Sequence, residues 1–309
     1  MQWPSARPVR DLYESLRTWH ALRRRRPGLF TARDAALGLH SLLLPQRLRH
    51  RQDARHFARH CSVSLHAPGI DRIHVRPLDV SFLWPSPADG RLWHPVEQET
   101  LASNPHGYTT PPVRLGPESV VLDVGACEGL FAFRVLKQRL AREVTCFEPF
   151  PSMAALLRQG AELNGLARHV RVEEVAVSNH AGTLGFRTDL GMDSSQVVMD
   201  PPPGFDGLRV LGTRIDDWLA STGRRLGPHD LLKIDAEGAD LDVLHGAEQT
   251  LRRDAPQVAV TTYHADDHAD AIHDWLRSVQ PAYRFRLKGF SFWTPRPRPV
   301  LLQASTLPD

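Results

Sequence analysis

Residues 230–251 read DLLKIDAEGADLDVLHGAEQTL, and residues 120–133 read VVLDVGACEGLFAF. Each stretch starts with an apolar run typical of a buried strand, passes through an acidic or glycine-rich turn, and continues into the start of a helix. Two such units indicate an open α/β sheet whose ligand lies over the carboxyl ends of the strands. The pair therefore predicts a cofactor site beside a polar reaction site.

The same alternation of strand and helix runs from residue 106 to the C-terminus. Apolar runs predict strands at 119–124, 143–147, 170–177, 209–215, 229–235, 257–263, 283–291 and 298–305. Helical spacing predicts helices at 128–140, 151–164, 237–252 and 266–279. This order indicates an α/β fold with a doubly wound, mostly parallel sheet covered on both faces. The last two strands, joined by TPRPRP without a helix, are expected to pair antiparallel at one edge.

The first hundred residues have a different, mainly helical pattern. Apolar residues at helical spacing predict helices at 9–26, 31–44 and 47–61. Thr31 is the expected N-cap of the second of these helices. The segment RIHVRPLDVSFLW at 72–84 alternates like a strand, and RLWHPVE at 91–97 is expected to return beside it as a hairpin.

A Pro/Gly-rich linker, HGYTTPPVRLGPES, separates the two patterns and places a domain boundary near residue 105. The chain then divides into an N-terminal region, 1–105, and an α/β domain, 106–309. We expect the N-terminal region to form a lid, an acceptor contact or a homodimer contact. Its first 62 residues hold 13 arginines and four acidic residues. Nucleic-acid binding is therefore an alternative function, although a solvated helical face or a subunit contact is the commoner use of such arginines.

The composition is that of a globular protein, with 41% hydrophobic and 24% charged residues and a net charge of +3. No run of about 18 apolar residues is present, so no membrane-spanning helix is expected. No N-terminal apolar segment with a cleavage site is evident either. The three cysteines form no CxxC pair, which indicates neither a zinc knuckle nor a disulfide framework. We expect a cytoplasmic protein.

The first glycine-rich turn has the features of a cofactor cradle. Asp123, Gly125 and Gly129 lie where an apolar strand gives way to a helix, and glycine there lets a ligand approach the main chain. The spacing differs from the GxGxxG of dinucleotide binders. Glu148, followed by Pro149, ends the next strand, where an acid accepts hydrogen bonds from ribose hydroxyls. Together these residues favour an adenosyl ligand over the alternative of glycines that only permit close packing.

Two further segments are candidates for cofactor contacts, on weaker grounds. In VEEVAVSNHAG, Glu174 or Ala176, together with Val177, is expected along the adenine edge, since a purine pocket needs an apolar wall and one polar contact. The loop GMDSSQV at 191–197 offers Asp193, Ser194 and Ser195 to a cofactor or substrate.

The second turn carries the polar reaction site. LLKIDAEGAD places Lys233, Asp235 and Glu237 around the end of an apolar strand. A lysine beside two carboxylates there must be paired or functional. One of the two acids is expected to cap the following helix and the other to serve the site.

The next strand ends in TTYHADD and offers a base. His264 lies at its carboxyl end, and an ordinary pKa of about 6.5 suits removal of a hydroxyl proton. Asp266 or Asp267 is the expected orienting acid. Alternatively, Asp235, Glu237 and His264 hold Mg²⁺ or Mn²⁺, which is possible but less favoured.

These motifs resemble FkbM-family S-adenosylmethionine-dependent methyltransferases over residues 105 to 290. The segments that carry the resemblance are DVGACEG at 123–129, FEP at 147–149, VAVS at 175–178, TRIDDWL at 213–219, LKIDAEGADLDVLHGAEQTL at 232–251 and TYHADD at 262–267. The IDAEG segment with its helix is the specific part. The family often has Asn-Ile where this chain has Cys127-Glu128.

The resemblance implies a seven-stranded, Rossmann-like sheet and S-adenosylmethionine as methyl donor. The expected cofactor contacts are Asp123, Gly125, Cys127, Glu128, Gly129, Glu148, Pro149, Ala176 and Asp235, and the expected catalytic residues are His264, Asp235 and Glu237. The matched positions place Asp123 and Gly125 at the methionine end and Glu148 at the ribose, and Glu128 near the donor's ammonium. The expected reaction is O-methylation of a sugar or secondary metabolite, a small-molecule acceptor. The alternative is N-methylation of an amine or amide.

Overall fold

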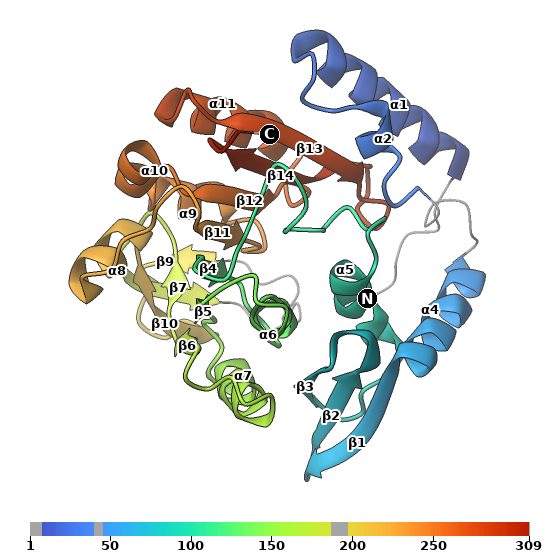
Figure 1. The fold of residues 1–309 in the computed structure, drawn as a ribbon, viewed down its shortest axis with the longest axis vertical. Helices are drawn as coiled ribbons and strands as arrows, with labels where there is room; N and C mark the ends of the chain where they lie inside the picture. The colour runs from blue at the N-terminus through green and yellow to red at the C-terminus, as the bar shows by residue number, and fades with distance from the viewer. Residues whose placement is uncertain (1–7, 40–45, 187–196, 309) are drawn as a thin grey trace.

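A computed structural model describes residues 8–39, 46–186 and 197–308. Seven strands form its central sheet, in the order β13-β14-β12-β11-β4-β5-β6 (Figure 1). Their bounds are β4 (Val120–Val124), β5 (Glu143–Phe147), β6 (Val170–Glu173), β11 (Leu231–Ile234), β12 (Gln257–Thr261), β13 (Arg284–Phe290) and β14 (Pro299–Ser305). β12, β11, β4, β5 and β6 run parallel, and β14 pairs antiparallel with both β12 and β13. The predicted α/β fold and its antiparallel edge pair are confirmed.

The chain order reverses at the centre of this sheet. From β4 the chain moves outward through β5 and β6, and it later returns to place β11 on the other side of β4. Ligands of open α/β sheets bind at such a switch point, beyond the carboxyl ends of the strands. The loops that follow β4 and β11 therefore frame the candidate site.

Alternate residues of the central strands pack into two separate cores. Val121 and Leu231 share one core with α6 (Leu130–Lys137) and α7 (Pro151–Leu163). Leu122 and Leu232 face the other way. The helices on their side are α8 (Ile215–Thr222), α9 (Asp240–His245), α10 (Glu248–Asp254) and α11 (His268–Val279). Apolar residues on both faces are what a covered parallel sheet requires.

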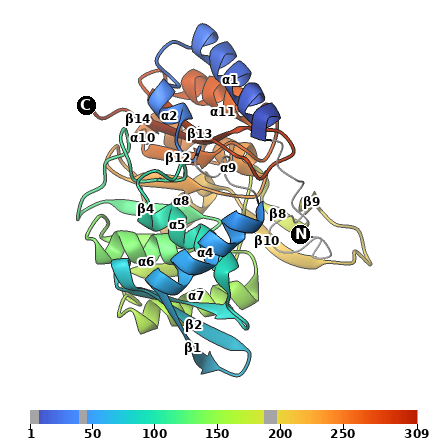
Figure 2. The ribbon, with the colours of Figure 1, turned by 90° about the vertical axis from the view of Figure 1, so that its right-hand side faces the viewer.

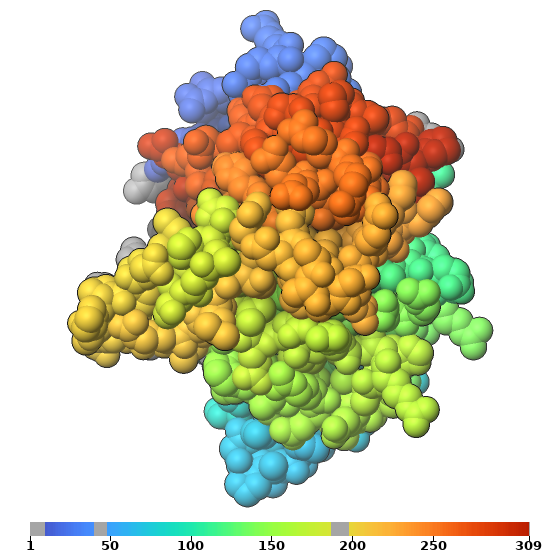
Figure 3. Space-filling model, turned by 90° about the vertical axis from the view of Figure 1, so that its left-hand side faces the viewer, coloured from blue at the N-terminus to red at the C-terminus, as the bar shows by residue number. Residues whose placement is uncertain are grey.

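Four strands of the described residues form a second sheet, which the sequence did not indicate. They are β7 (Ala176–Val177), β8 (Gly182–Phe186), β9 (Val197–Met199) and β10 (Leu208–Thr213), in the order β7-β10-β8-β9. The strand expected at 170–177 is therefore wrong as one element, because β6 and β7 belong to different sheets. The strand expected at 209–215 lies in this second sheet, and TRIDDWL continues into α8. Figures 2 and 3 show the second sheet projecting from the side of the molecule.

The N-terminal region contains helices and a small antiparallel sheet. The helices are α1 (Pro8–Arg25), α2 (Ala32–Ala35), α4 (Gln46–His60) and α5 (Trp93–Thr100), and the strands are β1 (Cys61–Ala67), β2 (Ile70–Val75) and β3 (Val80–Pro85). Thr31 accepts a hydrogen bond from the Asp34 N–H, as an N-cap should. The second predicted helix is only one turn in its described part, and residues 40–45 lie outside the described residues.

Two predictions for this region are wrong. The segment 72–84 is not one strand, because the 3-10 turn Arg76–Leu78 and the left-handed Asp79 (φ 50°) reverse the chain between β2 and β3. The segment 91–97 does not return as a strand but lies mostly in α5, which packs beside α6. Hairpin pairing is instead made by β1, β2 and β3.

Helix α1 is held against the α/β domain by ion pairs, and one indole fixes it to the segment that follows it. Arg26, just after α1, bonds to Asp270 at 2.8 Å and Asp274 at 2.7 Å, both on α11. Trp19 donates from Nε1 to the Phe30 carbonyl at 2.9 Å. Two of the four arginines at 23–26 therefore serve an intramolecular contact, since Arg25 also pairs with Asp270. Within 8–39, 46–186 and 197–308, none of the helices combines the length and apolarity that crossing a bilayer demands.

Candidate active site

The loops after β4 and β11 touch each other at the switch point. Gly125 has φ +74°, and a Cβ placed on it would lie 1.9 Å from the Asp235 carbonyl oxygen. The Asp235 N–H donates to the Val124 carbonyl at 3.0 Å, which extends the β4–β11 pairing by one residue. Only glycine combines this backbone angle with this closeness. Gly125 thus brings the predicted cofactor loop directly against the predicted reaction site.

A buried ion pair lies beneath the two loops. Lys233 Nζ is 2.7 Å from Asp123 Oδ1 and donates to the Gly125 carbonyl at 3.0 Å. Burial alone would lower the pKa of Lys233, but the carboxylates of Asp123 and Asp235 outweigh it and raise this pKa above its ordinary value. Asp123 is fully buried, and its pKa is raised by burial although Lys233 opposes the rise. Asp123 therefore shapes the cofactor loop from below through Lys233.

Glu148 stands just beyond β5 as a buried carboxyl group. Its side chain is 4% exposed. The Cys127 N–H donates to Oε2 and the Phe150 N–H donates to Oε1, both at 3.0 Å. Burial raises the pKa of Glu148 to about 7 against the lowering effect of these two bonds. Each oxygen keeps further acceptor capacity, which fits a pair of ribose hydroxyls.

The loop between β4 and α6 has a compact, glycine-dependent shape. Cys127 has φ 46° and Gly129, the N-cap position of α6, has φ +81°. Burial raises the pKa of Glu128, which is partly buried between these two residues. Pro149 connects Glu148 to the residues that start α7. Ala176, in β7, packs in a small apolar cluster with Phe150, Phe186 and Val210 rather than in the central sheet.

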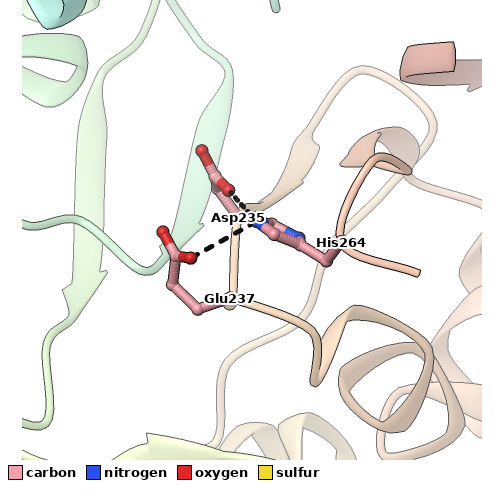
Figure 4. Close-up of side chains that lie close together, drawn as sticks. All are labelled: Asp235, Glu237 and His264. Carbon is pink, nitrogen blue, oxygen red and sulfur yellow. Dashed lines mark ion pairs between the residues drawn. The ribbon is translucent and has the colours of Figure 1, made fainter. Parts of the chain in front are cut away.

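The predicted catalytic residues lie together at the ends of β11 and β12 (Figure 4). His264 Nε2 is 3.8 Å from Asp235 Oδ1 and 3.5 Å from Glu237 Oε2. The side chains of His264 and Asp235 are 9% and 18% exposed, and that of Glu237 is 43% exposed. Glu237 has φ 48°, a left-handed conformation that costs a non-glycine residue of order 1 kcal/mol. The cluster is open to solvent on the side of Glu237.

Asp240, a residue that the sequence did not single out, positions His264. Its Oδ2 lies 2.8 Å from His264 Nδ1. The same carboxylate accepts from the Ala236 and Gly238 N–H groups and from Thr261 Oγ1. It closes the turn before α9, so the expected capping by Asp235 or Glu237 is wrong. The sequence signal for this role was the position of Asp240 as the last residue of IDAEGAD, directly after the IDAEG motif.

The electrostatics of His264 differ from the expectation of an ordinary pKa. Burial would lower the pKa of His264, but the hydrogen bond to Asp240 and the nearby carboxylates of Glu237 and Asp235 raise it to about 11. A protonated ring cannot act as a base, so this pKa counts against that role of His264, which stays a prediction. The expected orienting role of Asp266 is also wrong, because Asp266 pairs with Arg298 at 2.7 Å and Asp240 takes that role.

The segment before β4 contributes a further residue to the site. Tyr108 Oη donates to Asp235 Oδ2 at 2.9 Å, and Thr261 Oγ1 lies 3.2 Å from Asp235 Oδ1. The single hydroxyl proton of Thr261 is shared between Asp235 and Asp240 and lies closer to Asp240 Oδ1, at 2.9 Å, so Tyr108 makes the stronger contact with Asp235. The Tyr108 contact spans 127 positions of sequence, and the linker-like sequence around it has no pattern that reveals this contact. Asp193, Ser194 and Ser195 lie outside the described residues.

Comparison with known proteins places these motifs in one family. The family model described as the methyltransferase FkbM domain matches residues 123–287, more than half of the chain. The 2-O-methyltransferase NoeI of Sinorhizobium fredii is 33% identical over 152 residues, which is 44% of this chain and 60% of that protein. The 31-O-demethyl-FK506 methyltransferase FkbM of Streptomyces tacrolimicus is 31% identical over 165 residues, 44% of this chain and 62% of that protein.

The chain thus spans about 60% of the length of these two curated relatives. Among solved structures, the methyltransferase FkbM from Methylobacillus flagellatus is similar at 17% identity and a TM-score of 0.47. That match covers 67% of this chain and 47% of the other. The matched family confirms the resemblance that the motifs carry.

Proposed function

The chain belongs to the FkbM methyltransferase family, and from that premise we propose that it methylates a hydroxyl oxygen of a small-molecule acceptor, with S-adenosylmethionine as donor. One observation carries the proposal. At the switch point, the β4–α6 loop, which has the features of a donor-binding loop, lies against the polar cluster of Asp235, Glu237 and His264. Gly125 of the first lies against Asp235 of the second. A sugar or a secondary metabolite is the proposed acceptor class; one relative is named a 2-O-methyltransferase and the other a methyltransferase of 31-O-demethyl-FK506, which supports a hydroxyl acceptor.

Donor binding is assigned to the β4–α6 loop and Glu148. The buried Glu148 carboxyl is positioned by two backbone N–H groups and offers its remaining acceptor capacity to ribose hydroxyls. Gly125, Cys127, Glu128 and Gly129 present backbone to the methionine end. When bound, S-adenosylmethionine supplies a methyl group already activated on a sulfonium. The protein's task is then alignment of the acceptor and removal of its proton.

The acceptor side is assigned to Asp235, Glu237 and His264. Tyr108 and Thr261 fix the Asp235 carboxylate, and Asp240 fixes the His264 ring, so these two groups are preorganised. Glu237 is exposed enough to meet a substrate. No described contact favours a nitrogen acceptor. A homodimer contact through the N-terminal region, and the division of the chain near residue 105, stay predictions.

Calorimetric titration with S-adenosylhomocysteine tests the donor site. We expect binding, and we expect Glu148→Gln to weaken it about tenfold or more, because hydrogen bonds to a charged group contribute about 1.5–3 kcal/mol each. Glu143→Gln is the matched control, since Glu143 lies at the opposite end of β5 and makes only part-exposed ion pairs. Equal affinities in a folded Glu148→Gln variant and in the control would show that the ribose assignment is wrong.

A further inference from the structure

The cluster at the ends of β11 and β12 has the form of a cation site. Asp235, Glu237 and His264 each offer one ligand atom, and these three atoms lie within 4.8 Å of one another. Ligands about 2.1 Å from a shared metal ion lie about 3 Å apart at right angles and about 4 Å apart when opposite. The distances of 3.5 Å and 3.8 Å from His264 Nε2 to the two carboxylates fall in that range.

The His264 ring supplies an observation independent of the acidic residues. Asp240 accepts hydrogen bonds from two backbone N–H groups and a hydroxyl, so it is an ionised acceptor, and His264 Nδ1 must be the donor to it. The other ring nitrogen, Nε2, is buried and makes no hydrogen bond among the described residues, since its nearest acceptors, Glu237 Oε2 at 3.5 Å and Asp235 Oδ1 at 3.8 Å, make only ion-pair contacts with it. The side chain is 9% exposed, and Figure 4 shows Nε2 directed at both carboxylates.

A carboxylate that holds one nitrogen of a histidine while the other faces a cluster of ligands is the arrangement found around protein-bound metals. Burying a polar nitrogen without a partner costs about 1–3 kcal/mol, which a ligand at that point would remove. Three carboxylates, those of Asp235, Glu237 and Asp240, also surround this one imidazole. A cation satisfies both the nitrogen and the excess of negative charge.

We propose that Asp235, Glu237 and His264 bind one divalent cation, with Mn²⁺ preferred over Mg²⁺. Carboxylate oxygens suit Mg²⁺ and Mn²⁺ alike, but an imidazole nitrogen is a better ligand for Mn²⁺ and later transition metals. Three protein ligands leave coordination positions open. Asp240 is the positioning residue of the site, since it contacts His264 and not the cation.

The cation gives the acceptor-side cluster a specific use, and this part rests on the proposed function. An acceptor hydroxyl in an open coordination position would be oriented toward the donor and would release its proton more easily. His264 is then a ligand rather than the base. The acceptor must then bring its reacting oxygen to the metal ion from the side of Glu237, which is the exposed edge of the cluster. This requirement limits the class of acceptors.

The experiment titrates the full-length protein with MnCl₂ and follows the loss of the free Mn²⁺ signal by electron paramagnetic resonance. We expect one Mn²⁺ per chain, tighter than Mg²⁺ measured by competition. Glu237→Gln should weaken Mn²⁺ binding at least tenfold, and it is a conservative change of an exposed side chain. Asp240→Asn should weaken it about 10- to 100-fold through loss of ring orientation. Asp267→Asn is the matched control, because it removes an exposed charge from the same loop.

S-adenosylhomocysteine calorimetry on the same samples separates the two proposals. Donor binding without Mn²⁺ binding would overturn the cation site and leave the proposed methyl transfer standing. Equal Mn²⁺ affinity in the wild type, Glu237→Gln and His264→Gln proteins would also overturn it, since binding would then lie elsewhere. Mn²⁺ binding that depends on Glu237 and His264 supports the site, and if the donor failed to bind in that case, only the proposed function would fall.

Discussion

Glu148 carries a carboxyl group that is almost fully buried. Its folded-state pKa of about 7 lies above the ordinary value of 4.5 because burial disfavours the charged form. The folded protein therefore binds this proton more readily than the unfolded chain between those two values. Its contribution to stability is fully present below pH 4.5 and is lost as the pH rises through about 7. A bound ribose reverses this preference, since its hydroxyls donate to the ionised form.

Donor affinity is therefore expected to depend on pH. The affinity for S-adenosylhomocysteine should increase as the pH rises from about 6 to about 8, by up to about tenfold per pH unit below the pKa, and then level off. Calorimetry across that range measures it, and Glu148→Gln should give a flat profile. A wild-type profile as flat as that of the variant would show that Glu148 does not change its charge on donor binding.

At the residue scale, sequence reasoning located side chains that follow directly from strand ends. Asp235 and His264 were predictable because apolar runs end just before them, and parallel strands bring such ends to one edge. Tyr108 and Asp240 were not predictable in the same way. Their roles depend on where a linker crosses the sheet and on how a turn folds back, and neither has a periodic pattern. The pKa of His264 depends on those same neighbours.

At the scale of elements, β4 and β11 are joined by one buried ion pair. Asp123 and Lys233 are direct register partners in the parallel ladder and lie on the same face of the sheet. Tyr108 and Phe131 cover the ammonium, with ring centroids 5.3 Å and 5.8 Å from Nζ. The pair is therefore shielded from solvent, and each charge depends on the other.

Lys233→Met is expected to lower the free energy of unfolding by about 3–5 kcal/mol, because it leaves the Asp123 charge buried without a partner. Urea denaturation followed by circular dichroism measures the change. The double variant Asp123→Asn/Lys233→Met should recover part of the loss, and Lys137→Met, on the exposed end of α6, should change stability by less than about 0.5 kcal/mol. A Lys233→Met protein as stable as the Lys137 variant would contradict this account.

Elements with strong periodicity were predicted well and short ones were not. Strands 119–124, 143–147 and 257–263 have long apolar runs, because both of their faces are covered. β7 has two residues and β9 has three, and their pairing is set by the chain crossing back over itself. The sequence does not predict α8, because its eight residues are too few for a clear periodic pattern. β2 and β3 look like one strand in the sequence because the alternation continues through residues 72–84, although Pro77 lies in the turn that separates them.

At the scale of the whole molecule, the segment between the N-terminal region and β4 is bound to the sheet by buried polar side chains. Gln303 donates to the carbonyls of Tyr108 and Thr110, and Gln257 exchanges two hydrogen bonds with the backbone of Arg114. Lys288 donates to the Gly107 carbonyl at 2.7 Å. These three side chains are 0–1% exposed. The segment thus provides hydrogen-bond partners for these buried polar side chains of the sheet.

A fragment of residues 116–309 is therefore expected to lose most of its stability. The fragment loses the hydrogen bonds of these three side chains, about 0.5–1.5 kcal/mol net each, and also the apolar packing of Tyr108 and Val113 in the core, a large share of the roughly 5–15 kcal/mol of a whole domain. Thermal unfolding by circular dichroism compares this fragment with the full chain. A fragment that melts cooperatively at the same temperature as the full chain would show that the segment is dispensable.

The position of Tyr108 also bears on how members of this family could exchange parts. A natural or engineered graft of a relative's N-terminal region that extended through the linker, to residue 119, would replace the tyrosine that orients Asp235 together with the backbone that Gln257, Gln303 and Lys288 bind. A splice just before residue 104 keeps that set intact. If the N-terminal region contacts the acceptor as predicted, changes upstream of residue 104 alter acceptor preference while the donor end and the polar cluster are inherited together.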